Sequence, residues 1–259
     1  MRLLKNPLVI EGIELYFQDS KRLSAYIVYL LSTATILFVV WPTSQSLKIG
    51  EPPDTYNFVL IGTFIFIAYL SCTAGSRDLS QHRFHLPSQW IFSTPISIRA
   101  FLSGKLFIAF IHTLFLLFLA LPLIVIPRVI SGIALKEMGL GLLLTLVCCF
   151  TYRIIGLCNL ILMERNQPLL YIAERGAFLL FILITSSFFP LGNPVLAIIS
   201  LVAEEEKYRG VVFFQTLIPF FWMTMIIHLL IAFTFVIVMA QILIYFRKSR
   251  IHPEAVSLS

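Results

Sequence analysis

Residues 100–126, AFLSGKLFIAFIHTLFLLFLALPLIVI, are apolar over almost their whole length and include a single Lys or Arg, Lys105. About 20 apolar residues in a helix cross the hydrocarbon core of a bilayer. A helix is favoured in lipid because it pairs its backbone polar groups within the segment. The stretch therefore predicts a transmembrane helix.

The composition of the whole chain agrees with this prediction. The 259 residues are 59% hydrophobic and 12% charged, and the mean hydropathy is +0.93. Soluble globular chains carry about a quarter charged residues. The net charge of +6 does not indicate nucleic acid as a partner, because no basic stripe is interleaved with aromatic residues. All four cysteines lie in apolar runs without metal-ligand spacing, so we expect neither a disulfide framework nor a metal site.

Six segments are long and apolar enough to span a membrane. They are residues 24–41, 56–73, 100–126, 139–163, 168–189 and 220–246. Because no linker divides them, we expect one domain over residues 1–259, an all-α integral membrane protein with six transmembrane helices. Pro127 is expected to follow the end of the third span, since proline stops a helix beyond its first turn.

Lys and Arg are unevenly distributed between the two sides of the predicted bundle. With the N-terminus placed inside, they are more numerous in the loops and span ends of that side. Cytoplasmic loops carry such an excess. We therefore expect a multi-pass protein of the cytoplasmic membrane with both termini in the cytoplasm, where residues 74–99 would also lie.

Residues 1–23 predict an amphipathic helix in the cytoplasmic membrane interface. Asn6 can cap this helix, with Pro7 at its first position. The helical period places these apolar residues on one face: Val9, Ile13, Tyr16 and Phe17. Basic residues then follow at the level of the lipid headgroups.

Residues 190–219 are too interrupted to form another span. Three prolines divide them into apolar pieces of roughly 8 to 10 residues, a length that fits broken, re-entrant helices on the outer side. Asn193, which precedes Pro194, is expected to cap a half-helix over residues 195–203.

The sequence offers little catalytic chemistry. The pair Gly104-Lys105 lacks the Gly and the Ser or Thr that a phosphate-binding P-loop requires. The ionisable residues within the predicted spans are few and scattered, whereas an intramembrane enzyme or an ion-coupled carrier gathers several at one depth. Apart from Lys105, which lies near the headgroups at the start of the third span, they are Arg153, Glu174, Arg175, His112 and His228. We expect the two histidines to be hydrogen-bonded core residues, and Arg153 either to snorkel or to serve a pathway or an interface.

The polar gap before the third span, HLPSQWIFSTPISIRAFLSGK (residues 85–105), predicts a short cytoplasmic helix. Pro87 can open it, and the Pro95 that follows Ser93 and Thr94 ends it. Ser97 can then cap the third span. The short helix displays Trp90 with apolar neighbours, which are a liability in water unless a partner covers them. Anchoring of the Trp in the membrane interface is the alternative.

Together these features resemble the type-2 ATP-binding-cassette permeases. The resemblance covers essentially the whole chain, and it rests on the six spans and on three motifs. The motifs are NPLVIEGIELYFQDSKR (residues 6–22), STPISIRAFLSGKL (residues 93–106) and NPVLAI (residues 193–198). The chain departs from the family at Asp78 and at residues 86–89, LPSQ, where the family commonly has a Glu and a Gly-Thr-Leu-Glu.

The resemblance implies a permease subunit that pairs with a second copy or a homologous permease. Two separate ATPase subunits, which bind ATP and Mg²⁺, would drive export of a lipid-like, glycan-linked or hydrophobic substrate. The chain itself would be no enzyme and would bind no cofactor. The residues implied in ATPase docking are Pro87, Ser88, Gln89, Trp90, Ile91, Phe92, Ser93, Thr94 and Pro95, with Pro7, Glu11 and Glu14 of the N-terminal helix.

The remaining candidate residues and functions stay open at this stage. Possible pathway or interface charges are Arg153, Glu174 and Arg175, and Asn193 and Pro194 open the outer re-entrant helix. One alternative function is a non-transporting membrane anchor or mechanotransmitter driven by an ATPase. Another is an ion-coupled carrier or an intramembrane enzyme.

Overall fold

The computed structural model describes residues 6–17, 20–42, 54–77, 96–162, 190–202, 210–213 and 216–251. These residues form seven α-helices, one short 3-10 helix and two strands. The helices are α1 (Pro7–Phe17), α2 (Ser20–Val39), α4 (Thr55–Arg77), α6 (Ile98–Ile130), α7 (Leu135–Leu162), α9 (Pro194–Val202) and α10 (Phe220–Ile251). The 3-10 helix is η2 (Pro190–Gly192), and the strands are β1 (Gly210–Phe213) and β2 (Thr216–Pro219).

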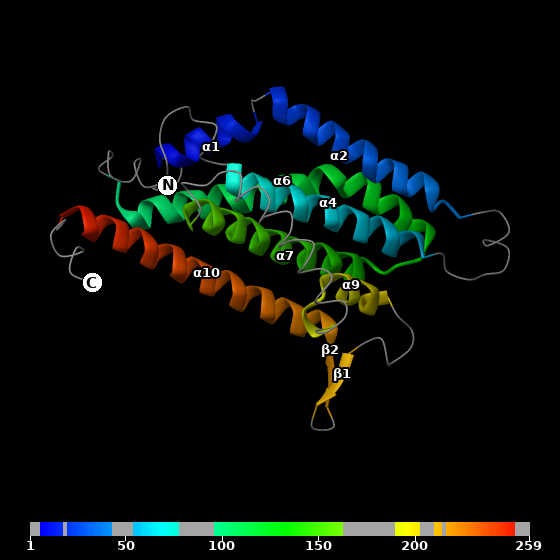
Figure 1. The fold of residues 1–259 in the computed structure, drawn as a ribbon. Helices are drawn as coiled ribbons and strands as arrows, with labels where there is room; N and C mark the ends of the chain where they lie inside the picture. The colour runs from blue at the N-terminus through cyan, green and yellow to red at the C-terminus, as the bar shows by residue number, and fades with distance from the viewer. Residues whose placement is uncertain are drawn as a thin grey trace.

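The long helices lie lengthwise beside one another in an elongated bundle (Figure 1). Four of the described helices, α4, α6, α7 and α10, are long and apolar enough to cross a membrane. The protein is therefore mostly helical and has the character of a multi-pass membrane protein. The apolar run of α2, Leu23–Val39, is shorter. The fifth predicted span, residues 168–189, lies outside the described residues, and the count of six spans stays a prediction.

Helix α6 confirms its predicted start and corrects its predicted end. Ser97 caps it, since the Ala100 N–H donates a hydrogen bond to Ser97 Oγ (3.2 Å). The helix continues through Pro127 to Ile130, so the expectation that Pro127 follows its end is wrong. A proline removes one N–H donor, but membrane helices tolerate this loss. The helix ends instead before Gly132, whose φ of 67° is left-handed.

Helices α4 and α7 are in close contact along their length. A β-carbon on Gly156 of α7 would overlap the carbonyl oxygen of Cys72 in α4, and one on Gly141 would lie 2.7 Å from Leu60 Cδ2. Small residues of this kind let two helix backbones approach closely in a membrane. Gly141 and Gly156 therefore allow α7 to pack closely on α4 within one subunit. All four cysteines are free and buried, and Cys72, Cys148 and Cys149 lie in this core.

The segment between η2 and α10 confirms one short helix and corrects the rest. Asn193 Oδ1 accepts hydrogen bonds from the N–H groups of Val195 (2.8 Å) and Leu196 (3.3 Å), so the half-helix α9 is capped as predicted. Strands β1 and β2, however, form an antiparallel hairpin where a further short helix was expected (Figure 1). Val211 pairs with Ile218 there, and β-branched pairs of this kind favour a sheet. Re-entry of residues 190–219 into the membrane stays a prediction.

Candidate functional site

The predicted site residues are only partly within the described chain. The docking segment, Pro87 to Pro95, lies outside the described residues, and so do Glu174 and Arg175. Of the remaining predicted residues, Pro7, Glu11 and Glu14 lie on α1 and Arg153 lies on α7. Asn193 and Pro194 lie at the start of α9, at a distance from α1 (Figure 1). Within the described residues, the proposed ATPase-docking residues are therefore those of α1.

Helix α1 begins against the first turn of α6. The Asn6 side chain donates a hydrogen bond from Nδ2 to the Ala100 carbonyl (2.7 Å), and its Oδ1 accepts one from the Leu8 N–H (3.1 Å). Asn6 thus caps its own helix, as predicted, and ties it to another. A β-carbon on Gly104 would lie 2.7 Å from Asn6 Nδ2 and 3.2 Å from Leu8 Cβ, so this close approach requires a glycine.

The contacts between α1 and α6 continue in the same direction along both helices. A β-carbon on Gly12 would lie 2.7 Å from Ile108 Cγ1, and the Tyr16 ring lies 4.3 Å from the His112 ring, centroid to centroid. Both helices advance by four residues from one contact to the next, which is about one helical turn. Helix α1 therefore runs lengthwise beside the first part of α6 (Figure 1).

This packing divides the predicted apolar face of α1. Val9 and Tyr16 are fully buried against the bundle, whereas Ile13 and Phe17 are about two-fifths exposed. The four residues share one face of α1 by the helical period, as predicted, but the bundle covers only the part of that face that carries Val9 and Tyr16. The position of α1 relative to the membrane surface stays a prediction.

Tyr16 brings four helices together at the end of α1. The guanidinium carbon of Arg153 in α7 lies over the Tyr16 ring, 4.6 Å from its centroid. The hydroxyl of Tyr26 in α2 donates a hydrogen bond to the Tyr16 carbonyl (2.9 Å) and lies 2.9 Å from Nε2 of His112 in α6. Because the Tyr26 proton goes to Tyr16, Nε2 of His112 is the donor in the second contact. We call Tyr16, Tyr26, His112 and Arg153 the Tyr16 junction.

Arg153 is buried inside the protein. Its side chain is only 2% exposed, although a charge at this depth is costly. Snorkelling, one of the two predicted explanations, would carry the guanidinium to the surface. The structure instead places the cation against the face of an aromatic ring, whose quadrupole attracts it. The contact joins α1 to α7 within one subunit, and a pathway or interface role for Arg153 stays a prediction.

A second polar cluster joins α7 to α10 and to the 3-10 turn. His228 Nδ1 donates a hydrogen bond to the Thr224 carbonyl (2.9 Å), so Nε2 can accept one from the Tyr152 hydroxyl (3.3 Å). Thr151 Oγ1 donates to the His228 carbonyl (3.2 Å), and Thr224 Oγ1 donates to the Leu191 carbonyl (2.9 Å). His112 and His228 are thus hydrogen-bonded core histidines, as predicted.

The sequence interpretation missed the tyrosines of both clusters. Tyr16 was assigned only to an apolar face, and neither Tyr26 nor Tyr152 was singled out. A signal was available, because a buried tyrosine hydroxyl normally needs a hydrogen-bond partner. Tyrosines on otherwise apolar helices therefore indicate where polar side chains of other helices lie.

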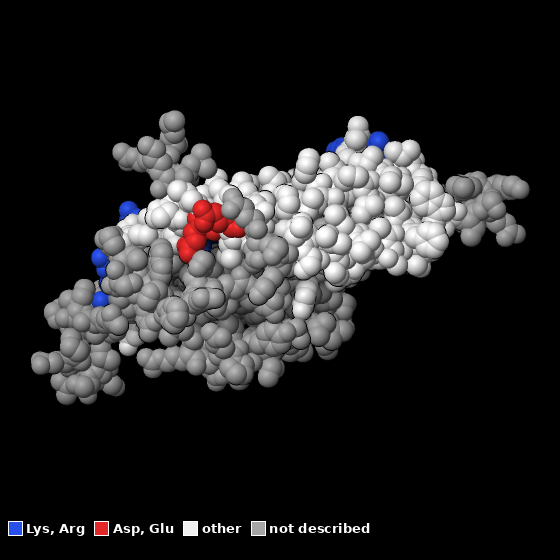
Figure 2. Space-filling model, turned by 90° about the horizontal axis from the view of Figure 1, so that it is seen from above, with Lys and Arg blue, Asp and Glu red and all other residues white. Residues whose placement is uncertain are grey.

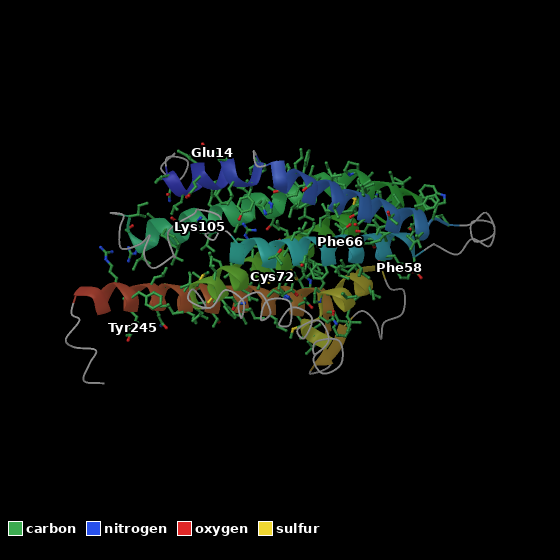
Figure 3. All side chains as sticks on the ribbon, turned by 45° about the horizontal axis from the view of Figure 1, so that its top comes forward. Glu14, Phe58, Phe66, Cys72, Lys105 and Tyr245 are labelled. Atoms are coloured by element: carbon green, nitrogen blue, oxygen red, sulfur yellow. The ribbon has the colours of Figure 1, made fainter. Side chains whose placement is uncertain are left out.

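Helix α1 carries two acidic residues, the half-buried Glu11 and the exposed Glu14. Figure 2 shows acidic side chains gathered in one patch, beside a long uncharged surface. Glu14 lies on the outer side of α1, and it is exposed (Figure 3). This face could meet a positively charged partner surface. It lies at the same end of the bundle as the start of α6 and the end of α10 (Figure 1).

Neither a metal cluster nor a known relative defines the chemistry of this site. Across the part of the chain that the structure describes, no group of three or more His, Cys, Asp or Glu residues could hold a metal ion. No protein-family model, curated protein or solved structure matches this sequence. The contacts of α1 and the sequence motifs are therefore the observations that bear on function.

Proposed function

We propose that this chain is the membrane-spanning permease subunit of an ATP-binding-cassette exporter. Separate ATPase subunits would supply the energy by binding ATP and Mg²⁺. The supporting observation is the bond from the Asn6 side chain to the Ala100 carbonyl (2.7 Å). It joins the Asn-Pro motif of α1 to the motif STPISIRAFLSGKL, so two of the segments that carry the family resemblance meet in space.

This arrangement fits the transmission of force from ATPase subunits to the bundle. The proposed docking segment, Pro87 to Pro95, is followed after a single residue by Ser97, the cap of α6. Helix α1, the second proposed docking element, packs on the first part of the same helix. A displacement at either element would therefore act on α6. This helix has 33 residues and is about 50 Å long at 1.5 Å per residue.

The proposed cargo is a lipid-like, glycan-linked or hydrophobic substrate. The outer surface of α10 carries large exposed apolar side chains, among them Trp222, Leu230 and Phe233. Such a surface suits contact with lipid, with an amphipathic cargo, or with a second permease copy. We place the protein in the cytoplasmic membrane with both termini inside, paired with itself or with a homologous permease.

Co-purification from native membranes tests the proposal. The tagged chain should retain an ATPase subunit and ATP hydrolysis, and the double variant Trp90→Ala with Phe92→Asp should lose both. Trp41→Ala is the matched control, because Trp41 is exposed just beyond the end of α2 that lies far from α1. Absence of any ATPase, or its full retention by the double variant, would contradict the proposal. Transport by the purified chain alone would favour an ion-coupled carrier.

A further inference from the structure

We infer that Tyr16 and Arg153 are positioning residues that couple α1 to α7, so that α1 cannot move without α7. The inference gives the proposed permease a second route for transmission, and in that sense it rests on the proposed function. The coupling itself is a property of this chain and can be measured without a partner.

The geometry of the Tyr16 junction supports this coupling. The contacts of Asn6 and Gly12 join α1 to α6, whereas the Tyr16 ring also contacts α7 through Arg153 (4.6 Å from ring centroid to guanidinium carbon). The Tyr16 carbonyl accepts a hydrogen bond from Tyr26 of α2 (2.9 Å). One residue of α1 is thus in contact with three other helices.

Because Arg153 is buried, its charge favours states in which α1 and α7 remain in contact. The guanidinium is 2% exposed, and the face of the Tyr16 ring is part of what stabilises it there. If α1 moves away, the Tyr16 ring leaves the guanidinium. The charge of Arg153 then stays buried without this stabilising contact. The charge therefore disfavours states in which α1 has moved and α7 has not.

The coupling extends beyond α7. Tyr152 precedes Arg153 in α7, and its hydroxyl lies 3.3 Å from His228 Nε2 in α10. Thr224, four residues before His228, donates a hydrogen bond to the Leu191 carbonyl (2.9 Å), close to the start of α9. Contacts therefore run without interruption from α1 to the segment near α9. Spatial continuity alone does not prove coupling, so the test must measure an interaction between substitutions.

Hydrogen–deuterium exchange of the full-length protein in lipid nanodiscs provides that test. Tyr16→Leu removes the aromatic face, and Arg153→Met removes the charge while keeping a long side chain. Each substitution should raise amide exchange in α1 by roughly 10- to 30-fold, as expected for a desolvated cation–π contact. The double variant should exchange no faster than the single variants. If the increase in exchange of the double variant equalled the product of the two single increases, the inference would be overturned.

Conservative variants separate this role from general packing. Tyr16→Phe keeps the aromatic face and Arg153→Lys keeps the charge, so each should raise exchange less than Tyr16→Leu or Arg153→Met does. Ile13→Ala is the matched control on the exposed side of α1 and should leave exchange nearly unchanged. Tyr16→Phe behaving like Tyr16→Leu would overturn the inference, even if the Arg153 variants fail to fold.

The outcomes for the inference and for the proposed function are distinguishable. If an ATPase co-purifies but the exchange effects of Tyr16→Leu and Arg153→Met multiply, the permease function stands and the inference fails. If the effects do not multiply and no ATPase co-purifies, the inference stands and the proposed function fails.

Discussion

The backbone of Gly156 in α7 lies against the carbonyl oxygen of Cys72 in α4, leaving no room for a β-carbon. Gly156→Ala should therefore force the two helices apart and destabilise the protein by about 1–3 kcal/mol, the usual cost of overpacking. Thermal unfolding in detergent measures the effect. Gly139→Ala is the matched control in the same helix, since its β-carbon would have no neighbour within 4 Å. A similar loss of stability in both variants would contradict the close contact.

The two hydrogen bonds of Asn6 can be separated by substitution. Asn6→Asp keeps an oxygen that accepts from the Leu8 N–H but removes the donor to the Ala100 carbonyl. Asn6→Ala removes both, and we expect it to destabilise α1 by about 1–2 kcal/mol, with a smaller loss for Asn6→Asp. Protease cleavage near α1 measures the difference. Equal loss in the two variants would show that the cap contributes nothing.

The hydroxyl of Tyr152 and the imidazole of His228 should contribute a measurable interhelical hydrogen bond. A double-mutant cycle with Tyr152→Phe and His228→Ala should give a coupling energy of about 0.6 kcal/mol, the average for such bonds in a membrane bundle. His228→Asn offers a side-chain N–H for the Thr224 carbonyl and should retain more stability than His228→Ala. A coupling energy of zero would mean that the 3.3 Å contact is not a stabilising bond.

Charge reversal on α1 tests its proposed role in ATPase docking. Glu14→Lys should weaken co-purification of the ATPase by about two- to fivefold, in line with an exposed ion pair, and the loss should shrink at high salt. Asp54→Lys is the control, because Asp54 is an exposed acid that precedes α4 at the opposite end of the bundle. The docking proposal for α1 would be contradicted if the two reversals had the same effect.

The features that the sequence predicted correctly depend on neighbouring residues. Apolar runs of span length located α6, α7 and α10, because lipid favours helices of that length. Ser97 and Asn193 marked helix starts, since a cap and its backbone donors are two or three residues apart. The prediction for Pro127 was wrong because it considered the proline alone. The helix around Pro127 tolerates the loss of one backbone N–H donor.

The features that the sequence did not predict depend on contacts between distant segments. Nothing local distinguishes Tyr16 from the apolar residues near it, and its role appears only when Arg153 of α7 reaches its ring. The β1–β2 hairpin is a related case. Short apolar pieces such as residues 210–213 fit a helix or a strand, and pairing with residues 216–219 decides between them.

The burial of every native thiol makes this chain convenient for labelling chemistry. Cys72, Cys148, Cys149 and Cys158 are at most 5% exposed, so a bulky maleimide cannot reach them while the fold is intact. A cysteine introduced at exposed Ile13 would then react alone and carry a spectroscopic probe on α1, without removal of the native cysteines. Reaction at the native sites would in turn report when the helices separate.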